Sequence, residues 1–229
     1  MQRRKFTSGV VSLGGLWALA GHADAATLSE GDATLGVRAA LERGAVAAVG
    51  LLGKSGGFLD NPKVRIPLPG FLNDAAKLLK ATGQQKRVDE LITAMNRAAE
   101  AAVPEAKALL VSAVKAMSVG DATRLIRGGE NSVTEFFADK TRSPLGVKFL
   151  PIVTKATEKV SLADKYNRVA GKASGLGLVK KEDANVQQYV TRKALDGLYL
   201  MIGEEERKIR QDPVGTGSAI LGKVFGALK

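Results

Sequence analysis

The sequence contains no cysteine, only one histidine and only one tryptophan. Without cysteine, the chain has no disulfide bond, no thiol nucleophile and no thiolate metal site. Aromatic residues make up only 5% of the chain, whereas alanine and leucine are abundant, and this composition favours helices over sheets. The sequence therefore excludes several classes of enzyme before any motif is considered.

The first 25 residues have the features of a bacterial export signal. The basic start Arg3-Arg4-Lys5 precedes a short apolar run over residues 10–20, which is too short to span a membrane stably. Ala23-Asp24-Ala25 fits the A-x-A pattern and predicts cleavage after Ala25. The basic start followed by Phe6 resembles a twin-arginine signal, and the alternative is an ordinary secretory signal with two adjacent arginines. We therefore expect a protein of the periplasm, or one otherwise exported.

Cleavage at this point would remove both His22 and Trp17, the only residues of their kinds. A mature chain that starts at Ala26 has neither histidine nor cysteine. Ser-His-Asp and Cys-His catalysis, histidine zinc sites, and ligation of haem or iron–sulfur clusters by those residues are then excluded. No G-x-G-x-x-G or Walker loop occurs either. We therefore expect no cofactor and no metal site.

The chain is strongly basic, with a net charge of +11. Removing residues 1–25 takes away three of the 34 basic residues and one of the 23 acidic ones, which leaves a charge of +9. This excess predicts weak, salt-sensitive association with anionic surfaces or polymers. We expect no nucleic-acid partner, because base-stacking aromatics are few and export argues against one. No transmembrane helix is expected in the mature chain.

Helical periodicity runs through most of residues 26–229 and predicts an all-α fold, a single-domain bundle of many helices. Residues 63–69 are the exception, because apolar side chains alternate there as they do in a strand. Pro67 and Pro69 restrict this segment to an edge strand or a short extended strap. After Pro213, apolar residues return at helical spacing and predict a last amphipathic helix.

Several predicted helix boundaries depend on proline or on a capping side chain. Pro104 interrupts the longest helix-periodic stretch, residues 87–117, and predicts a kinked helical pair at the centre of the bundle. Ser143-Pro144 predicts the start of a further helix, which Pro151 then kinks. Asp183 is placed to cap a long helix over residues 184–211.

The central helix carries an unusual polar row formed by Asn96, Arg97 and Glu100. A row that faces solvent would more commonly carry lysine and glutamate, and asparagine is a poor helix former. We therefore expect at least two of these three side chains to be buried and to bond to another segment. The strap near Arg65, or residues in the 140s, is the predicted partner. Together with Arg65, the row forms our candidate binding site.

Several runs along the chain match a known family in combination. They are Met95-Asn96-Arg97-Ala98-Ala99-Glu100, Lys148-Phe149-Leu150-Pro151-Ile152-Val153 and Lys193-Ala194-Leu195-Asp196-Gly197-Leu198, together with the strap. The chain resembles the bacterial exported family known as domain of unknown function 4197 over nearly all of its mature length. This resemblance implies an all-helical exported domain. It implies no activity, so it assigns no functional residues. Gly215-Thr216-Gly217-Ser218 departs from the family, whose members usually carry a more helix-favouring run there.

Two classes of function fit these exclusions. The first, which we favour, is an exported, non-catalytic helical protein that acts as a binding or scaffold module. The second is a histidine-free hydrolase or lyase that uses carboxylates together with Tyr166, Tyr189 or Tyr199. We interpret the acidic run over residues 204–206 as a solvated face, because neighbouring helix residues point about 100° apart. Two carboxylates converging in a cleft would favour the second class.

Overall fold

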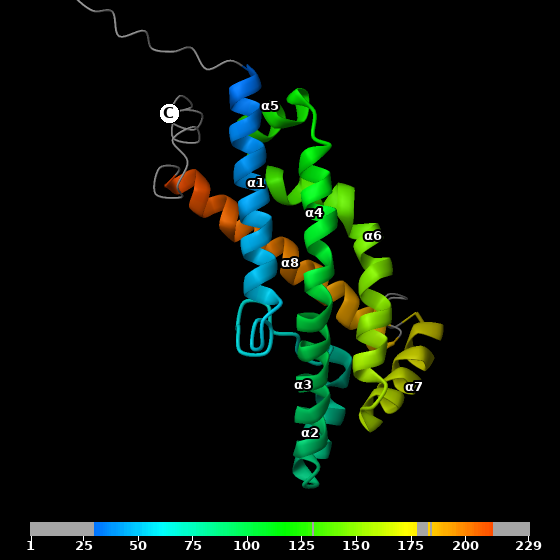
Figure 1. The fold of residues 1–229 in the computed structure, drawn as a ribbon. Helices are drawn as coiled ribbons and strands as arrows, with labels where there is room; N and C mark the ends of the chain where they lie inside the picture. The colour runs from blue at the N-terminus through cyan, green and yellow to red at the C-terminus, as the bar shows by residue number, and fades with distance from the viewer. Residues whose placement is uncertain (1–29, 130, 178–182, 184, 213–229) are drawn as a thin grey trace, which may run out of the picture.

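The computed structural model describes residues 30–129, 131–177, 183 and 185–212. All regular structure in these residues is helical, and no strand occurs among them, which confirms the predicted all-α class (Figure 1). The predicted signal peptide and the predicted amphipathic helix after Pro213 lie outside the described residues.

The described helices follow the predicted pattern closely in the first half of the chain. They are α1 (Glu30–Leu52), η1 (Gly70–Leu72), α2 (Asn73–Ala81), α3 (Gln85–Ala102), η2 (Val103–Glu105), α4 (Ala106–Lys115) and α5 (Val119–Arg127). The second half contains α6 (Ser132–Thr157), α7 (Ser161–Gly175) and α8 (Val186–Gln211). As predicted, Pro104 interrupts the central pair, because the 3-10 turn η2 separates α3 from α4.

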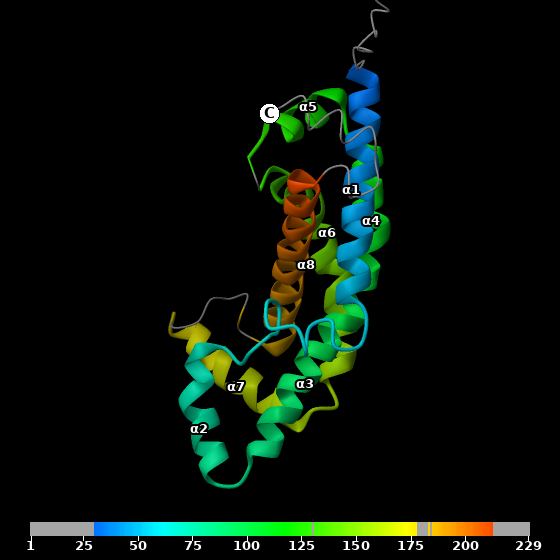
Figure 2. The same cartoon turned by 90° about the vertical axis from the view of Figure 1, so that its left-hand side faces the viewer.

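The helices form an elongated bundle, in which α1 and α4 run side by side and α8 crosses them (Figure 1). Figure 2 shows α5 at one end of the bundle and the α2–α3 hairpin with α7 at the other. Buried apolar side chains from α1, η2, the helices α3 to α8 and the segment between α1 and α2 join into one hydrophobic core. Its largest fully buried members include Phe58, Phe137 and Phe149. Burial of apolar side chains of this size is the main force that stabilises such a bundle.

The structure corrects the predicted break at Ser143-Pro144, because α6 continues without interruption through both Pro144 and Pro151. Both prolines lie on the exposed side of the helix. The carbonyls that lose a partner belong to the exposed residues Lys140 and Val147, where water can replace the missing hydrogen bonds. The opposite side is a continuous buried stripe, and its packing outweighs the local effect of the prolines. Its members are Val133, Phe137, Thr141, Leu145, Phe149 and Val153.

The structure also corrects the cap of the last described helix. Asn185, not Asp183, caps α8, and its side-chain oxygen accepts a hydrogen bond from the backbone N–H of Gln188 at 2.8 Å. Asp183 instead pairs with the Arg192 guanidinium at 2.6 Å, two turns into the helix. Both residue types are good helix caps, so the sequence alone did not distinguish them.

The segment between α1 and α2 crosses the middle of the bundle and contains the predicted strap, residues 63–69. Val64 and Ile66 are buried, whereas Arg65 and Pro67 are exposed, as the alternating pattern predicted. The preceding loop inserts Phe58 against α8 at Gly197. A Cβ atom at Gly197 would lie 2.8 Å from the Phe58 ring, so the close approach of loop and helix requires glycine.

Candidate functional site

The buried side chain of Asn96 joins α3 to the strap. Its Oδ1 accepts the backbone N–H of Ile66 at 2.8 Å, and its Nδ2 donates to the Ile66 carbonyl at 2.9 Å. The same Nδ2 donates to the Ile92 carbonyl at 2.8 Å. Asn96 is 0% exposed, so these hydrogen bonds supply the partners that a buried amide needs.

One turn further along α3, Glu100 binds the loop that precedes the strap. Its Oε1 accepts the backbone N–H groups of Phe58 at 3.1 Å and Leu59 at 3.0 Å, and its Oε2 accepts from Arg97 at 2.6 Å. Burial raises the pKa of Glu100, but the hydrogen bonds from Leu59, Arg97 and Phe58 together outweigh burial and lower it. The carboxylate is therefore ionised at neutral pH. Arg97 also donates to Ser55 at 2.7 Å.

These contacts confirm the prediction that at least two residues of the polar row are buried. Asn96 binds the strap as expected, whereas Glu100, which is 4% exposed, binds the 58–59 loop instead of the strap or the 140s. Arg97 and Arg65 are exposed, and the structure does not bring Arg65 into the row. We call Asn96, Arg97 and Glu100 the polar clamp. Because protein groups satisfy the buried oxygens and the amide, the clamp has an architectural role.

The three tyrosines considered as catalytic groups are buried and hydrogen-bonded. Tyr189 donates to the Pro67 carbonyl at 3.0 Å, and the Tyr199 hydroxyl lies 2.9 Å from the Thr141 hydroxyl. Burial is the main cause that raises the pKa of each phenol, to about 12 for Tyr189. Phenols of this kind stay protonated at neutral pH, so they are poor bases and poor nucleophiles.

Glu206 is the carboxylate whose environment sequence reasoning missed. Residues 204–206 were interpreted as a solvated face, yet Glu206 is only 5% exposed. Its Oε1 accepts from Arg210 at 2.7 and 2.9 Å, whereas its Oε2 has no hydrogen-bond partner among the described residues. Burial raises the pKa of Glu206 despite the adjacent arginine. The sequence did contain one indication that Glu206 is buried. It lies four residues after Ile202, on the apolar stripe of α8.

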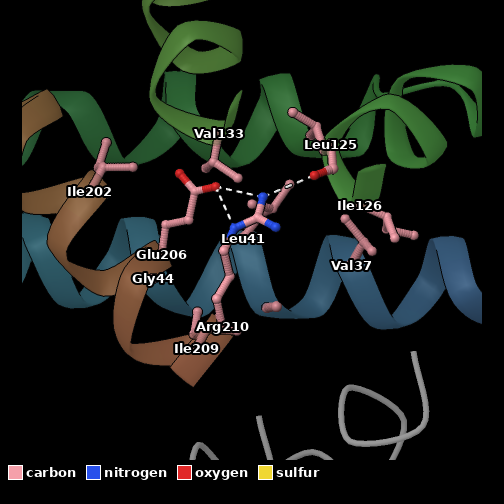
Figure 3. A pocket seen from close by; sticks show the side chains of 11 residues that line it. Val37, Leu41, Gly44, Leu125, Ile126, Val133, Ile202, Glu206, Ile209 and Arg210 are labelled. Atoms are coloured by element: carbon pink, nitrogen blue, oxygen red, sulfur yellow. Dashed lines mark hydrogen bonds and ion pairs between the residues drawn. The ribbon is translucent and has the colours of Figure 1, made fainter. Parts of the chain in front are cut away.

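Figure 3 shows that Glu206 and Arg210 lie beside a small cavity between α1, α5, α6 and α8. The other lining residues are apolar or glycine, and Glu206 is the only acid among them. The cavity volume is about 30 Å³, which is room for about two water molecules. A cavity of this size with one carboxylate cannot hold the paired acids and substrate of a carboxylate-dependent hydrolase.

A larger apolar groove lies between α2, α3 and α7, at the end of the bundle opposite α5 (Figure 2). Its volume is about 130 Å³. It is lined by Leu68, Leu72, Ala76, Leu79, Val88, Leu91, Leu162, Lys165, Tyr166 and Val169. We call it the α2–α7 groove. Both α2 and α7 pack on α3, which forms its floor, and Lys165 is its one charged lining residue.

Exposed apolar side chains occur on both helices that border this groove, and Val169 lines it, whereas Leu78 is the neighbour of the lining residue Leu79. Leu78 on α2 is 67% exposed, and Val169 on α7 is 50% exposed. Phe71 is also partly exposed, and its ring packs edge-on against Tyr166 with the centroids 6.1 Å apart. Exposed apolar side chains near an apolar hollow are typical of binding sites. No described helix is long and apolar enough to cross a membrane.

Together, the fold and these sites define an all-helical protein with an internal polar clamp and an open apolar groove. The chain belongs to the family described as protein of unknown function (DUF4197), whose model matches residues 27–226. The match confirms the resemblance drawn from the sequence. Comparison with curated proteins and with solved structures found no match.

Proposed function

We propose that the protein is an exported, non-catalytic binding protein whose ligand site is the α2–α7 groove. The observation that carries the proposal is the groove itself, which is open, about 130 Å³ in volume and almost entirely apolar. Small-molecule sites are usually preformed hollows lined by apolar side chains with few polar groups. The ligand is therefore an apolar molecule or an apolar chain.

Export to the periplasm, by the twin-arginine route, is part of this proposal. Its support is the basic start Arg3-Arg4-Lys5, the short apolar run and the cleavage pattern before Ala26. An exported protein that exposes apolar side chains such as Leu78 and Val169 meets lipids and other apolar envelope components.

The catalytic alternative has less support from the geometry. Asp121, Glu135 and Asp139 line an open cleft of about 540 Å³ between α5 and α6, but Asp121 is already paired with Arg124. The best carboxylate for catalysis is Glu206, because burial raises the pKa of this group and one of its oxygens has no partner among the described residues. However, no second acid lines that cavity. The three tyrosines are packed in the core. We therefore place the function in the groove.

The proposal is tested with an uncharged fluorescent probe, N-phenyl-1-naphthylamine, which brightens on entering an apolar site. We expect saturable binding by the purified exported protein. Ala76→Phe fills the groove from α2 without adding charge, and it should reduce probe affinity by at least about tenfold. Ala108→Phe makes the same change on the exposed face of α4 and should leave affinity unchanged. Equal binding by both variants would place the ligand site elsewhere.

A further inference from the structure

The segments that border the α2–α7 groove contain an excess of basic residues. Residues 71–92, which include α2 and the start of α3, and residues 161–175, which form α7, together contain seven basic and four acidic side chains. The basic ones are Lys77, Lys80, Lys86, Arg87, Lys165, Arg168 and Lys172. This end of the bundle is therefore positively charged around an apolar hollow.

On both helices that border the groove, exposed apolar side chains lie next to basic side chains in the sequence. On α2, the exposed Leu78 follows Lys77 and precedes Lys80. On α7, the half-exposed Val169 directly follows Arg168 and lies one turn after Lys165. Lys80 and Lys165 form no ion pair with the described residues, so their ammonium groups are available to an external anion.

We propose that this end of the molecule docks on an anionic lipid bilayer, with Leu78 and Val169 entering the interface. The inference rests on the proposed function, because the groove then receives an acyl chain of the same bilayer. Interfacial binding combines buried apolar area with attraction of basic side chains to anionic headgroups. The lysines of α2 and α7 complement the headgroup phosphates, and the apolar side chains complement the acyl boundary.

Docking is measured with a tryptophan reporter. Predicted cleavage removes Trp17, the only tryptophan, so Leu78→Trp in the exported protein carries a single one. Vesicles of phosphatidylglycerol should shift its emission to the blue and sediment with the protein, whereas vesicles of phosphatidylcholine should do neither. A reporter at Val147, an exposed apolar position on α6, should show no shift with either lipid. A blue shift of equal size at Val147 would overturn the proposed orientation.

The contribution of the basic residues is tested by removing equal charge in two places. In the groove variant, Lys80, Lys165 and Lys172 on the bordering helices α2 and α7 are replaced by glutamine. In the control variant, Lys107, Lys115 and Lys148 on α4 and α6 are replaced by glutamine. All six lysines are exposed, and the two variants have the same net charge because each loses three lysines. Each lysine near the membrane surface contributes about fivefold to binding, so the groove variant should bind vesicles roughly 100-fold more weakly. Equal weakening in both variants would overturn docking by this end and indicate attraction by net charge alone.

One further variant separates this inference from the proposed function. Ala76→Phe blocks the groove but keeps every lysine. If it loses the uncharged probe and still binds the vesicles in a salt-sensitive way, both proposals are supported. If the wild-type protein never binds the probe but docks through the three lysines, the proposed groove ligand is wrong. Probe binding without any vesicle binding would overturn the docking inference alone.

Discussion

The side chain of Asn96 pairs with Ile66 as a neighbouring strand would, donating to its carbonyl and accepting from its N–H at 2.9 and 2.8 Å. Ile66 is buried and lies in an extended segment. No strand occurs among the described residues to satisfy its backbone groups. Because buried backbone groups need partners, one asparagine replaces the missing ladder and fixes the strap on the core.

Replacing Asn96 by alanine should therefore destabilise the fold. It leaves both backbone groups of Ile66 buried without partners, and each such group costs about 1–3 kcal/mol. We expect a loss of about 2–4 kcal/mol in the free energy of unfolding, measured by urea denaturation. Asn131→Ala is the matched control, because Asn131 is exposed and its side chain forms no capping hydrogen bond. A similar loss in both variants would contradict the proposed pairing.

Glu100 should make stability depend on pH in the acidic range. Its pKa in the folded protein is lowered from the ordinary value of 4.5, so its ionised form stabilises the fold above that value. This stabilisation is lost as pH falls from 4.5 to below the pKa that Glu100 has in the folded protein. We expect the stability difference between wild type and Glu100→Gln to shrink as pH falls through this window. Urea denaturation of the two proteins at several pH values measures this trend, and a difference that does not change with pH would contradict it.

The sequence was sufficient to predict most of the fold and one of the two buried contacts of the polar clamp. Helical periodicity defined α1 and the central pair, and the two prolines of the strap excluded an interior strand. The unusual asparagine indicated burial, and Asn96 binds the predicted segment. The predicted partner of Glu100 is the strap or the 140s, but Glu100 binds residues 58–59. Which backbone reaches a buried carboxylate depends on the path of a loop, which helical spacing does not determine.

Other features depend on contacts between segments distant in sequence. Pro144 gave a strong local signal for a helix boundary, yet the buried stripe on the opposite side of α6 keeps the helix continuous. Glu206 belongs to a charged run but faces α1 and α5 in the core. The groove was also not predicted, because Leu79, Leu91 and Leu162 come from three helices whose positions only the tertiary structure shows.

Export should produce a protein whose first residue is Ala26. The basic start, the short apolar run and Ala23-Asp24-Ala25 motivate this prediction. The intact mass of protein recovered from the periplasm measures it, and a mass that retains residues 1–25 would contradict it. Replacing Arg3 and Arg4 by lysine tests the route separately. Export should stop if the signal uses the twin-arginine pathway and should continue if it uses the general secretory pathway.

Gly197 should be the least replaceable glycine of α8. An added Cβ would lie 2.8 Å from the ring of the fully buried Phe58 and 3.3 Å from Val64. Overpacking of this kind costs about 1–3 kcal/mol, so Gly197→Ala should lower the midpoint of urea denaturation. Gly146→Ala is the matched control within α6, where the nearest atom would lie 4.0 Å away. It should be neutral or stabilise by up to about 1 kcal/mol, because alanine favours helices.

Glu206 should give the opposite pH dependence to Glu100. Burial raises its pKa in the folded protein above the ordinary value of 4.5. Below 4.5 the carboxyl is protonated in both the folded and the unfolded chain. As pH rises past 4.5, Glu206 ionises first in the unfolded chain, while it stays protonated in the folded protein. The free energy of unfolding therefore falls progressively until pH reaches the raised pKa. The stability of wild type relative to Glu206→Gln should therefore fall as pH rises through this window. Glutamine does not titrate, so urea denaturation of the two proteins across pH isolates this group. A difference that grows with pH would show that the Arg210 ion pair outweighs burial, and one that stays constant would show that the two effects cancel.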